Sequence, residues 1–387
     1  MKNKCILIVL LAFNLLFSHA ALAESLPDIL SEAAILIDAK TGSVLYEKNA
    51  DAKMYPASLT KIATAIYALE HGDLADVATV SENARSVEGS RVYLEEGEKV
   101  QLKKLIQGLL INSGNDAGVA IAEHLHGSIE AFAANLNRYL KKIGLENTNF
   151  VNPHGLFDPN HVTTAEDMAK LTRYAIENQD FSEIFGTKEL EWHGESWQTT
   201  IYTHHKLLRE MPYEGATGGK TGYTARSRNT LVTTAERENL HLIAVVLKGE
   251  NRQMVYNDTV NLLDYGFEYY QTASIPKGAA FVANGDTFVA ANDFYYTQKI
   301  GEPIKKKVNP EGILEIVNEN QELVASFPLE NALKNRQNEQ ESREESNKLN
   351  VLYGLPFLFV LAAAILVLIR AKIRPSAAGY ERTMRLK

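Results

Sequence analysis

Cysteine is almost absent from this sequence. The single cysteine, Cys5, lies in Met1–Ala23, which has a short basic start, an apolar run from Cys5 to Phe17 and the small residues Ala21-Leu22-Ala23 at its end. This order is typical of a secretory signal peptide that is cleaved before Glu24. The exported protein would then contain no cysteine, which excludes disulfides and thiol chemistry even in an exported location.

The sequence also lacks an excess of positive charge. It contains 40 Lys and Arg residues and 48 Asp and Glu residues, which gives a net charge of −8. Once the +5 of residues 370–387 and the +2 of Lys2 and Lys4 are set aside, the remaining chain carries −15. Such an acidic body argues against nucleic acid as a partner. The 45% apolar and 23% charged residues are typical of a globular protein and exclude collagen and general disorder.

No metal-binding motif is found among the ten histidines, and His-Glu-x-x-His does not occur. His124 and His126 are two residues apart on an expected helix, so their rings cannot share one face. We expect His204 and His205 to point to opposite sides of a strand, and His154 to be a hydrogen-bonded loop residue. The sequence therefore predicts no metal and no cofactor.

Charge is missing again near the other end of the chain. Val351–Ile369 is an uncharged run of 19 residues, about 28 Å long as a helix, followed at once by Arg370 and Lys372. This pattern predicts a transmembrane helix whose basic tail, residues 370–387, stays in the cytoplasm. The polar residues 331–350 before it are expected to form a linker or stalk.

Between these signals the hydrophobic pattern predicts a larger domain, residues 24–274, and a small all-β domain, residues 275–330. No internal repeat is visible. In the larger domain we expect a β-hairpin over 33–46, helices over 59–69, 164–176 and 260–270, two helical pieces in 102–125 interrupted at 113–115, and a strand pair over 229–234 and 240–248.

Ser58-Leu59-Thr60-Lys61 opens the first of these helices. Residues three apart share a helix face, so the Lys61 amine can reach the Ser58 hydroxyl. A desolvated lysine beside other cations loses its proton more easily and can activate a serine as a nucleophile. The spacing occurs a second time at Ser274 and Lys277, but that copy contains Pro276 and lies at a domain boundary, so we assign it no role.

Two further patterns follow along the chain. Ser113-Gly114-Asn115 interrupts a helical region, where a hydroxyl and an amide can project into a cleft. Lys220-Thr221-Gly222 follows two glycines, so its backbone can come close to a ligand. Lys40-Thr41-Gly42 has the same letters but lies at the expected hairpin tip, and we assign it to the turn.

The combination Ser-x-x-Lys, Ser-x-Asn and Lys-Thr-Gly, in this order, is found in class A β-lactamases and penicillin-binding proteins. From about Ser31 to Leu329 the chain resembles low-molecular-mass penicillin-binding proteins of the serine-type D-alanyl-D-alanine carboxypeptidase family. The resemblance rests on segments in the family's order: Pro56–Lys61, Asn112–Ala117, Asn152–Leu156, Thr164–Asp167 and Gly219–Thr224.

This resemblance implies an α+β fold of the β-lactamase/transpeptidase type. A five-stranded antiparallel sheet would be covered by helices, with a helical lobe that carries Ser113 and Asn115. The small all-β domain and the C-terminal transmembrane helix would follow.

The resemblance also implies a role for each motif residue. Ser58 would be the acylated nucleophile, Lys61 its base and Ser113 a proton relay to the leaving amine. The expected substrate-binding residues are Asn115 for the substrate amide, Lys220 for a positive field, Thr221 and Thr224 for the terminal carboxylate, and Gly222 and Tyr223, with the N–H groups of Ser58 and Tyr223 forming the oxyanion hole. Arg252 is near the position of an arginine that helps to bind the carboxylate, but its spacing does not align, and we leave it out of the site.

The implied partners are peptidoglycan stem peptides ending in D-Ala-D-Ala, with β-lactam antibiotics as covalent inhibitors and the membrane as the anchor. A β-lactamase or a DD-endopeptidase on the same scaffold remains an alternative, as does a non-catalytic wall-binding or β-lactam-sensing protein. No Asn in the chain has Glu four residues before it, and Gly114 stands where class A β-lactamases commonly have Asp. Both features favour the carboxypeptidase over the lactamase.

Overall fold

The computed structural model describes residues 25–333 and 361–369. The expected signal peptide, the tail at 370–387 and nearly all of the linker lie outside these residues. Of the expected membrane helix only 361–369 is described, and it is helical. Within the described ranges, no helix has the length and apolar character that a membrane crossing requires.

The described chain forms two compact units. The first contains residues up to Ser274 together with Tyr295–Pro303, and the second contains Ile275–Phe294 and continues from Ile304. The chain therefore leaves the first unit, returns to it for nine residues and leaves again.

A five-stranded antiparallel sheet is the centre of the first unit. Its order is β2-β1-β9-β8-β7, with β1 at Ala33–Asp38, β2 at Val44–Lys48, β7 at Ala216–Thr224, β8 at Arg228–Arg237 and β9 at Leu240–Gly249. β1 and β2 form the hairpin expected from the sequence, and β8 and β9 the expected strand pair.

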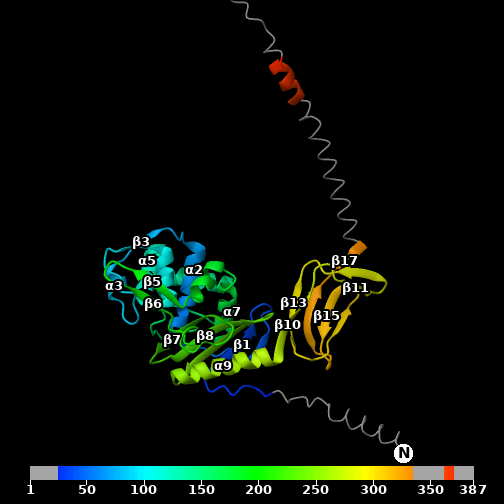
Figure 1. The fold of residues 1–387 in the computed structure, drawn as a ribbon, viewed down its shortest axis with the longest axis horizontal. Helices are drawn as coiled ribbons and strands as arrows, with labels where there is room; N and C mark the ends of the chain where they lie inside the picture. The colour runs from blue at the N-terminus through cyan, green and yellow to red at the C-terminus, as the bar shows by residue number, and fades with distance from the viewer. Residues whose placement is uncertain (1–24, 334–360, 370–387) are drawn as a thin grey trace, which may run out of the picture. The chain divides into compact units, whose positions relative to one another are not determined.

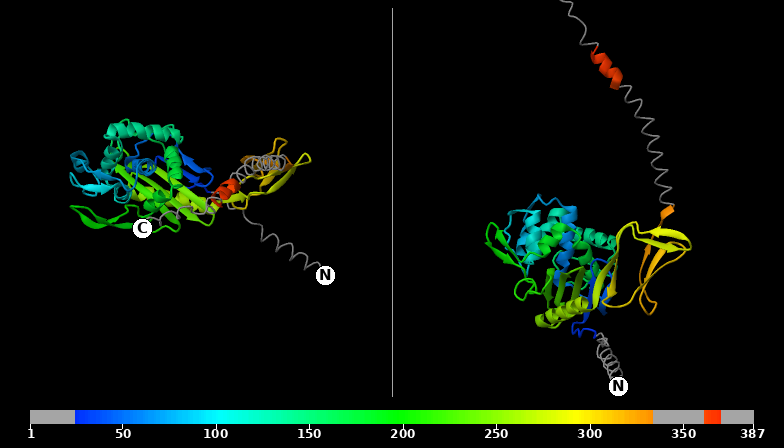
Figure 2. Two further views of the ribbon diagram at one scale, coloured as in Figure 1. Left: turned by 90° about the horizontal axis from the view of Figure 1, so that it is seen from above. Right: turned by 45° about the vertical axis from the view of Figure 1, so that its right-hand side comes forward.

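Successive side chains of a strand point to opposite sides of the sheet. Both faces of this sheet are buried, because helices cover each of them. Leu36 and Leu242 pack with Leu262 of α9 (Arg252–Tyr269) on one face, whereas Ile35 and Ile243 face the helical lobe on the other. Figure 2 shows α9 alone below the sheet and the remaining helices of this unit above it.

The helical lobe begins with a 3₁₀ turn, η1, at Ala57–Leu59, which leads directly into α2. The lobe contains α2 (Thr60–His71), α3 (Glu82–Ser86), α4 (Leu102–Ile111), α5 (Asn115–His126), α6 (Ile129–Lys142), α7 (Ala165–Ala175) and α8 (Gln179–Phe185), with two short hairpins, β3 (Val77–Thr79) with β4 (Lys99–Gln101) and β5 (Glu189–His193) with β6 (Gln198–Tyr202). The expected break at 113–115 is confirmed, since α4 ends at Ile111 and α5 starts at Asn115.

The last helix of the first unit is longer than the sequence indicated. α9 begins at Arg252, eight residues before the expected start, with the Asn251 side chain accepting a hydrogen bond from Met254 N at 2.9 Å. Its first turns are polar, and the buried Asp258 accepts hydrogen bonds from the Ser31 N–H and hydroxyl at 2.8 and 2.5 Å. This buried carboxylate interrupts the apolar stripe by which sequence analysis recognises a helix.

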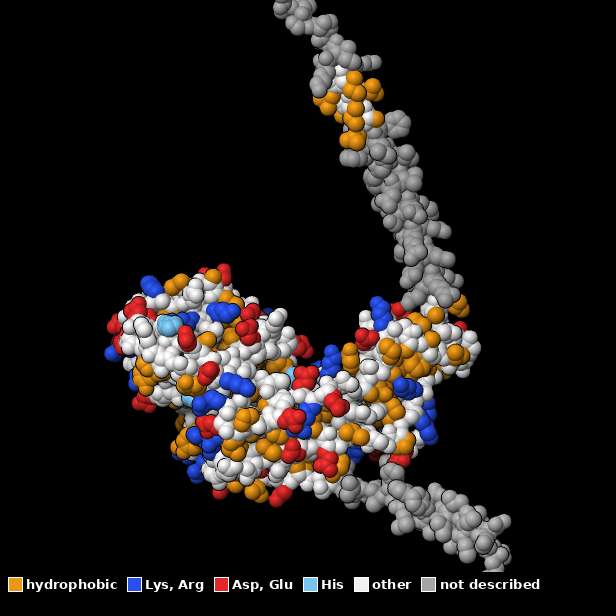
Figure 3. All heavy atoms as spheres, in the orientation of Figure 1, with side chains coloured by type: hydrophobic (Ala, Val, Ile, Leu, Met, Phe, Trp, Pro, Cys, Tyr) orange, Lys and Arg blue, Asp and Glu red, His pale blue; other side chains and the backbone are white. Residues whose placement is uncertain are grey.

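The second unit is built mainly of strands. One sheet contains β11 (Ala280–Ala283), β12 (Asp286–Val289) and β17 (Glu330–Asn331), and the other contains β14 (Lys305–Val308), β15 (Ile313–Val317) and β16 (Leu323–Pro328). Phe288, Leu314 and Ile316 are buried, while Val282 and Leu323 are exposed. Figure 3 shows apolar side chains gathered on the visible face of this unit. A unit of this size buries only part of its apolar surface.

The return of the chain adds a strand pair, in which β13 (Phe294–Lys299) pairs with β10 (Tyr270–Ile275). Ile300 N donates a hydrogen bond to the Tyr269 carbonyl at 2.8 Å. Thr297 Oγ1 donates to the buried carboxylate of Asp38 at 2.7 Å, and Thr272 Oγ1 donates to the same oxygen at 2.6 Å. Through these contacts, residues 295–303 become part of the first unit.

Candidate active site

A cleft of about 550 Å³ lies in the first unit, between the helical lobe and the sheet edge at β7. Ser58, Ser90 and Ser113 line it from the lobe. The opposite wall comes from β7, from the start of β8, from the segment after β6 and from the first turns of α9: Thr221, Gly222, Tyr223, Asn229, Thr230, Leu231, Thr203, His204, Lys206, Arg209, Glu210, Arg252, Val255 and Tyr256. The cleft therefore brings together Ser58, Ser113 and the Lys-Thr-Gly strand.

The backbone that leads into Ser58 is held from three sides. Ala57 has φ +51°, a conformation that is uncommon for a residue with a Cβ. Its carbonyl accepts a hydrogen bond from Thr60 Oγ1 at 2.9 Å, and the Pro56 carbonyl accepts one from Thr230 Oγ1 at 3.0 Å. Gly155 packs against the same segment so closely that a Cβ there would lie 1.8 Å from the Ala57 oxygen. These contacts fix the position of the Ser58 hydroxyl.

Lys61 is fully buried one turn after Ser58. Its Nζ lies 2.9 Å from Ser58 Oγ, 2.7 Å from Asn115 Oδ1 and 2.9 Å from the His154 carbonyl oxygen. Burial and the nearby Lys220 charge lower the pKa of Lys61 well below its usual value, against a smaller raising effect of Asp116. A neutral amine beside a serine hydroxyl is the arrangement of a general base and its nucleophile.

A second lysine and serine pair lies beside the first. Ser113, between α4 and α5, has φ +60°, and its Oγ accepts a hydrogen bond from Lys220 Nζ at 3.0 Å. Lys220 Nζ also donates to the Thr221 carbonyl at 2.8 Å. Burial lowers the pKa of Lys220 to about 7. The pair can therefore exchange a proton near neutral pH.

The β7 strand lies directly against the nucleophile because Gly222 has no side chain. A Cβ at Gly222 would lie 2.9 Å from the Ser58 nitrogen and 2.4 Å from Thr230 Oγ1. Tyr223 follows on the same strand, lines the cleft and is 61% exposed. The geometry brings the backbone of β7 to the Ser58 backbone nitrogen, where the sequence predicts an oxyanion hole.

Three of the expected substrate-binding residues, Asn115, Lys220 and Thr224, do not line the cleft. Asn115 is buried, with Oδ1 bound to Lys61 and Nδ2 donating to the Glu88 carbonyl at 2.6 Å. Thr224 Oγ1 lies 2.7 Å from Ser227 Oγ. Asn115 and Thr224 therefore already have partners within the protein.

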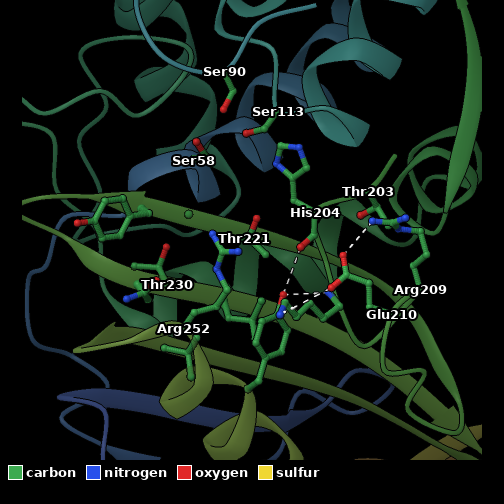
Figure 4. Close-up of a pocket in the computed structure, with 17 residues that line it drawn as sticks. Ser58, Ser90, Ser113, Thr203, His204, Arg209, Glu210, Thr221, Thr230 and Arg252 are labelled. Carbon is green, nitrogen blue, oxygen red and sulfur yellow. Dashed lines mark hydrogen bonds and ion pairs between the residues drawn. The ribbon is translucent and has the colours of Figure 1, made fainter. Parts of the chain in front are cut away.

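Arg252, which the spacing in the sequence does not assign to the site, lines the cleft. Figure 4 shows its side chain rising from α9 toward Thr221 and Thr230. The early start of α9 brings it there, and no spacing rule in the sequence indicates that start.

The prediction for His204 and His205 is wrong, because the two residues lie in a loop after β6 and not in a strand. His205 is buried, with Nε2 2.8 Å from Thr233 Oγ1, whereas the His204 ring lines the cleft. No sequence pattern around His204 indicates this position. Across residues 25–333 and 361–369, no group of three or more His, Cys, Asp or Glu side chains could hold a metal ion.

Comparisons with known proteins agree with this geometry. The description of peptidase family S11, D-alanyl-D-alanine carboxypeptidase, matches residues 20–251. The D-alanyl-D-alanine carboxypeptidase DacF of Bacillus subtilis is 34% identical over 258 residues, which cover 65% of this chain and 66% of that protein. The carboxypeptidase DacC of Escherichia coli is 35% identical over 288 residues, which cover 70% of this chain and 71% of that protein.

The crystal structure of penicillin-binding protein 5 from Haemophilus influenzae superimposes with a TM-score of 0.71 at 27% sequence identity. The match covers 79% of this chain and 98% of that one. It confirms the expected α+β transpeptidase-like fold. The family match covers more than half of the sequence and includes the Ser58, Ser113 and Lys220 motifs. The chain therefore belongs to the D-alanyl-D-alanine carboxypeptidase family, the S11 peptidases.

Proposed function

We propose that this chain is a serine-type carboxypeptidase that removes the terminal D-alanine from peptidoglycan stem peptides through an acyl-enzyme on Ser58. The observation that carries the proposal is the contact of 2.9 Å between Ser58 Oγ and the buried Lys61 Nζ. A neutral amine has two N–H bonds and one lone pair. When the N–H bonds point to Asn115 Oδ1 and the His154 carbonyl, the lone pair faces Ser58. Lys61 is then ready to accept the hydroxyl proton.

In the first half of the reaction, Ser58 Oγ bonds to the carbonyl carbon of the penultimate D-alanine while its proton moves to Lys61. The peptide C–N bond then breaks, and D-alanine leaves with a proton that passes from Lys61 through Ser113, which Lys220 contacts, so that Lys61 is neutral again. The N–H groups of Ser58 and Tyr223 stabilise the oxyanion. In the second half, a water molecule cleaves the ester with Lys61 or Ser113 handling the proton, and Ser58 is restored.

Residues on the wall of the cleft opposite Ser58 recognise the substrate. Thr221 and Arg252 bind the terminal carboxylate, within the positive field of Lys220. Asn115 binds the substrate amide through the second N–H of its side-chain amide, and Thr224 supports the carboxylate end of the site. β-Lactams enter the same cleft and acylate Ser58.

We also propose that the protein is exported and stays attached to the membrane. The signal peptide at 1–23 and the uncharged run at 351–369 support this placement. The catalytic domain would then lie outside the cytoplasm, next to the cell wall, and the basic tail inside.

The test is release of D-alanine from a peptide ending in D-Ala-D-Ala, together with covalent labelling by a fluorescent penicillin. Ser58→Ala should abolish both. Ser274→Ala, in the second Ser-x-x-Lys sequence, should change neither and serves as the matched control. Labelling that survives in Ser58→Ala, or a wild-type protein that releases no D-alanine, would contradict the proposal.

A further inference from the structure

His204 lies at the cleft in a segment whose neighbouring residues, 203, 205 and 206, are held by burial or hydrogen bonds. Thr203 and His205 are buried, and Thr203 Oγ1 accepts a hydrogen bond from His205 N at 3.2 Å. The hydroxyl of Tyr256, from α9, donates to the His204 carbonyl at 3.3 Å and accepts from Lys206 N at 2.9 Å. The backbone is therefore fixed on both sides of His204, and its side chain projects into the cleft.

The imidazole of His204 has no hydrogen-bond partner in the described part of the protein, although both its nitrogens can form one. Figure 4 shows the ring on the side of the cleft that carries Ser113, with Thr221 on the strand below it. A polar ring on a fixed backbone, without a partner in the described residues and in a cleft beside the nucleophile, is available to a bound ligand.

The charges that face His204 are mainly positive. Lys220 from β7, Arg252 from α9 and Arg209 from its own segment act on it with positive charge, and Lys61 from α2 does so only in its protonated form. The one acidic residue lining the cleft, Glu210, is paired with Arg209 at 2.9 Å and faces Lys206 at 3.7 Å. The residue is exposed toward the cleft, and partial desolvation there together with these cations lowers the pKa of the His204 imidazole. Around His204 the cleft thus carries more positive than negative charge, which an anion would complement.

We propose that His204 is a further ligand for the terminal carboxylate of the substrate, and that it takes up one proton from solvent as the carboxylate binds and returns it when D-alanine leaves. This inference rests on the proposed function. It makes His204 a residue that selects peptides with a free carboxyl end, in addition to Thr221 and Arg252.

The sign of the pH dependence follows from the charges. The substrate carboxylate raises the pKa of His204, so the complex binds more protons than the free protein, and affinity increases as the pH falls. The increase ends at the pH at which His204 of the free protein is itself protonated.

The test measures binding without turnover. Protein carrying Ser58→Ala is titrated calorimetrically with a D-Ala-D-Ala tripeptide at pH 6, in two buffers that differ in ionisation enthalpy. We expect net proton uptake, and we expect His204→Gln to remove part of it and to weaken binding roughly tenfold, the loss of one charge-assisted hydrogen bond. His204→Asn should behave in the same way. His193→Gln, at a histidine side chain that is 69% exposed on β5, is the matched control and should change neither quantity.

Equal proton uptake with and without His204 would overturn the inference. So would a His204→Gln protein with intact Ser58 whose kcat falls while its KM stays unchanged, because that pattern indicates proton transfer and not carboxylate binding. Penicillin labelling of Ser58 in His204→Gln separates the two proposals. Retained labelling leaves the nucleophile intact and assigns the effect to recognition, whereas a wild-type protein that is not labelled contradicts the proposed function itself.

Discussion

Replacing Lys220 by methionine should stabilise the protein while it abolishes the activity. Burial lowers the pKa of Lys220 from 10.5 to about 7, so folding favours its neutral form. A shift of one pKa unit corresponds to 1.36 kcal/mol, and at pH 6, where this lysine is protonated in both states, its charge costs the fold about 5 kcal/mol. The cost decreases as the pH rises from 7 to 10.5, because the unfolded protein binds more protons in that range. Methionine avoids this cost at every pH.

Part of this gain is offset by lost hydrogen bonds. Lys220 Nζ donates to Ser113 Oγ and to the Thr221 carbonyl, and each bond contributes about 1 kcal/mol. The net stabilisation at pH 6 is therefore about 3 kcal/mol, which for a unit of this size raises the melting temperature by roughly 6–12 °C.

Thermal unfolding followed by circular dichroism between pH 6 and pH 10 measures this effect. The advantage of Lys220→Met should be largest at pH 6 and should shrink toward pH 10. Lys53→Met, at an exposed lysine, is the matched control and should leave the melting temperature unchanged. A melting temperature of Lys220→Met that is equal to or lower than that of the wild type at pH 6 would refute the reasoning, as would a gain independent of pH.

Three further outcomes follow from the structure and the sequence. Gly155→Ala places a Cβ 1.8 Å from the Ala57 oxygen, at a φ of +88°. It should lower the free energy of unfolding by at least about 2 kcal/mol in chemical denaturation and slow the acylation of Ser58. Gly97→Ala, at a φ of +83° in open space, is the control that measures the cost of the φ alone. Penicillin bound to Ser58 should persist for minutes or longer in intact-mass measurements while the peptide is turned over many times; rapid return to the free mass would favour a β-lactamase. The full-length protein should resist extraction from membranes by alkaline carbonate, and its release would contradict a spanning anchor.

The sequence predicts the nucleophile region well because its geometry is local. The three-residue spacing of Ser58 and Lys61 fixes their contact once a helix begins there, and Gly114 with its neighbours ends one helical pattern before the next. The order of the motifs then identifies the family, which implies that Ser113 and Lys220 act in one site but not that they are in contact. The structure has this contact at 3.0 Å.

His204 and Arg252 could not be predicted in the same way, because tertiary contacts alone bring them to the cleft. Tyr256 and the buried ring of His205 position the His204 loop, and none of these contacts has a fixed spacing in sequence. Arg252 depends on a helix start whose apolar stripe is interrupted by Asp258. The second partners of Asn115 and Thr224 are likewise a property of packing that a motif does not encode.

The pairing of β13 with β10 determines when the catalytic unit can be completed. Asp38 lies in its first strand, yet one of its two threonine donors, Thr297, follows 259 residues later. The growing chain must therefore pass through the first part of the β unit before the catalytic unit can close. A chain shortened at Ser274 would retain Thr272 but lose Thr297, and the buried Asp38 carboxylate would lose half of its threonine hydrogen bonds. A protease cut between 275 and 294 would instead leave two fragments that strand pairing and this carboxylate hold together, so that the polypeptide is severed while the catalytic unit stays assembled.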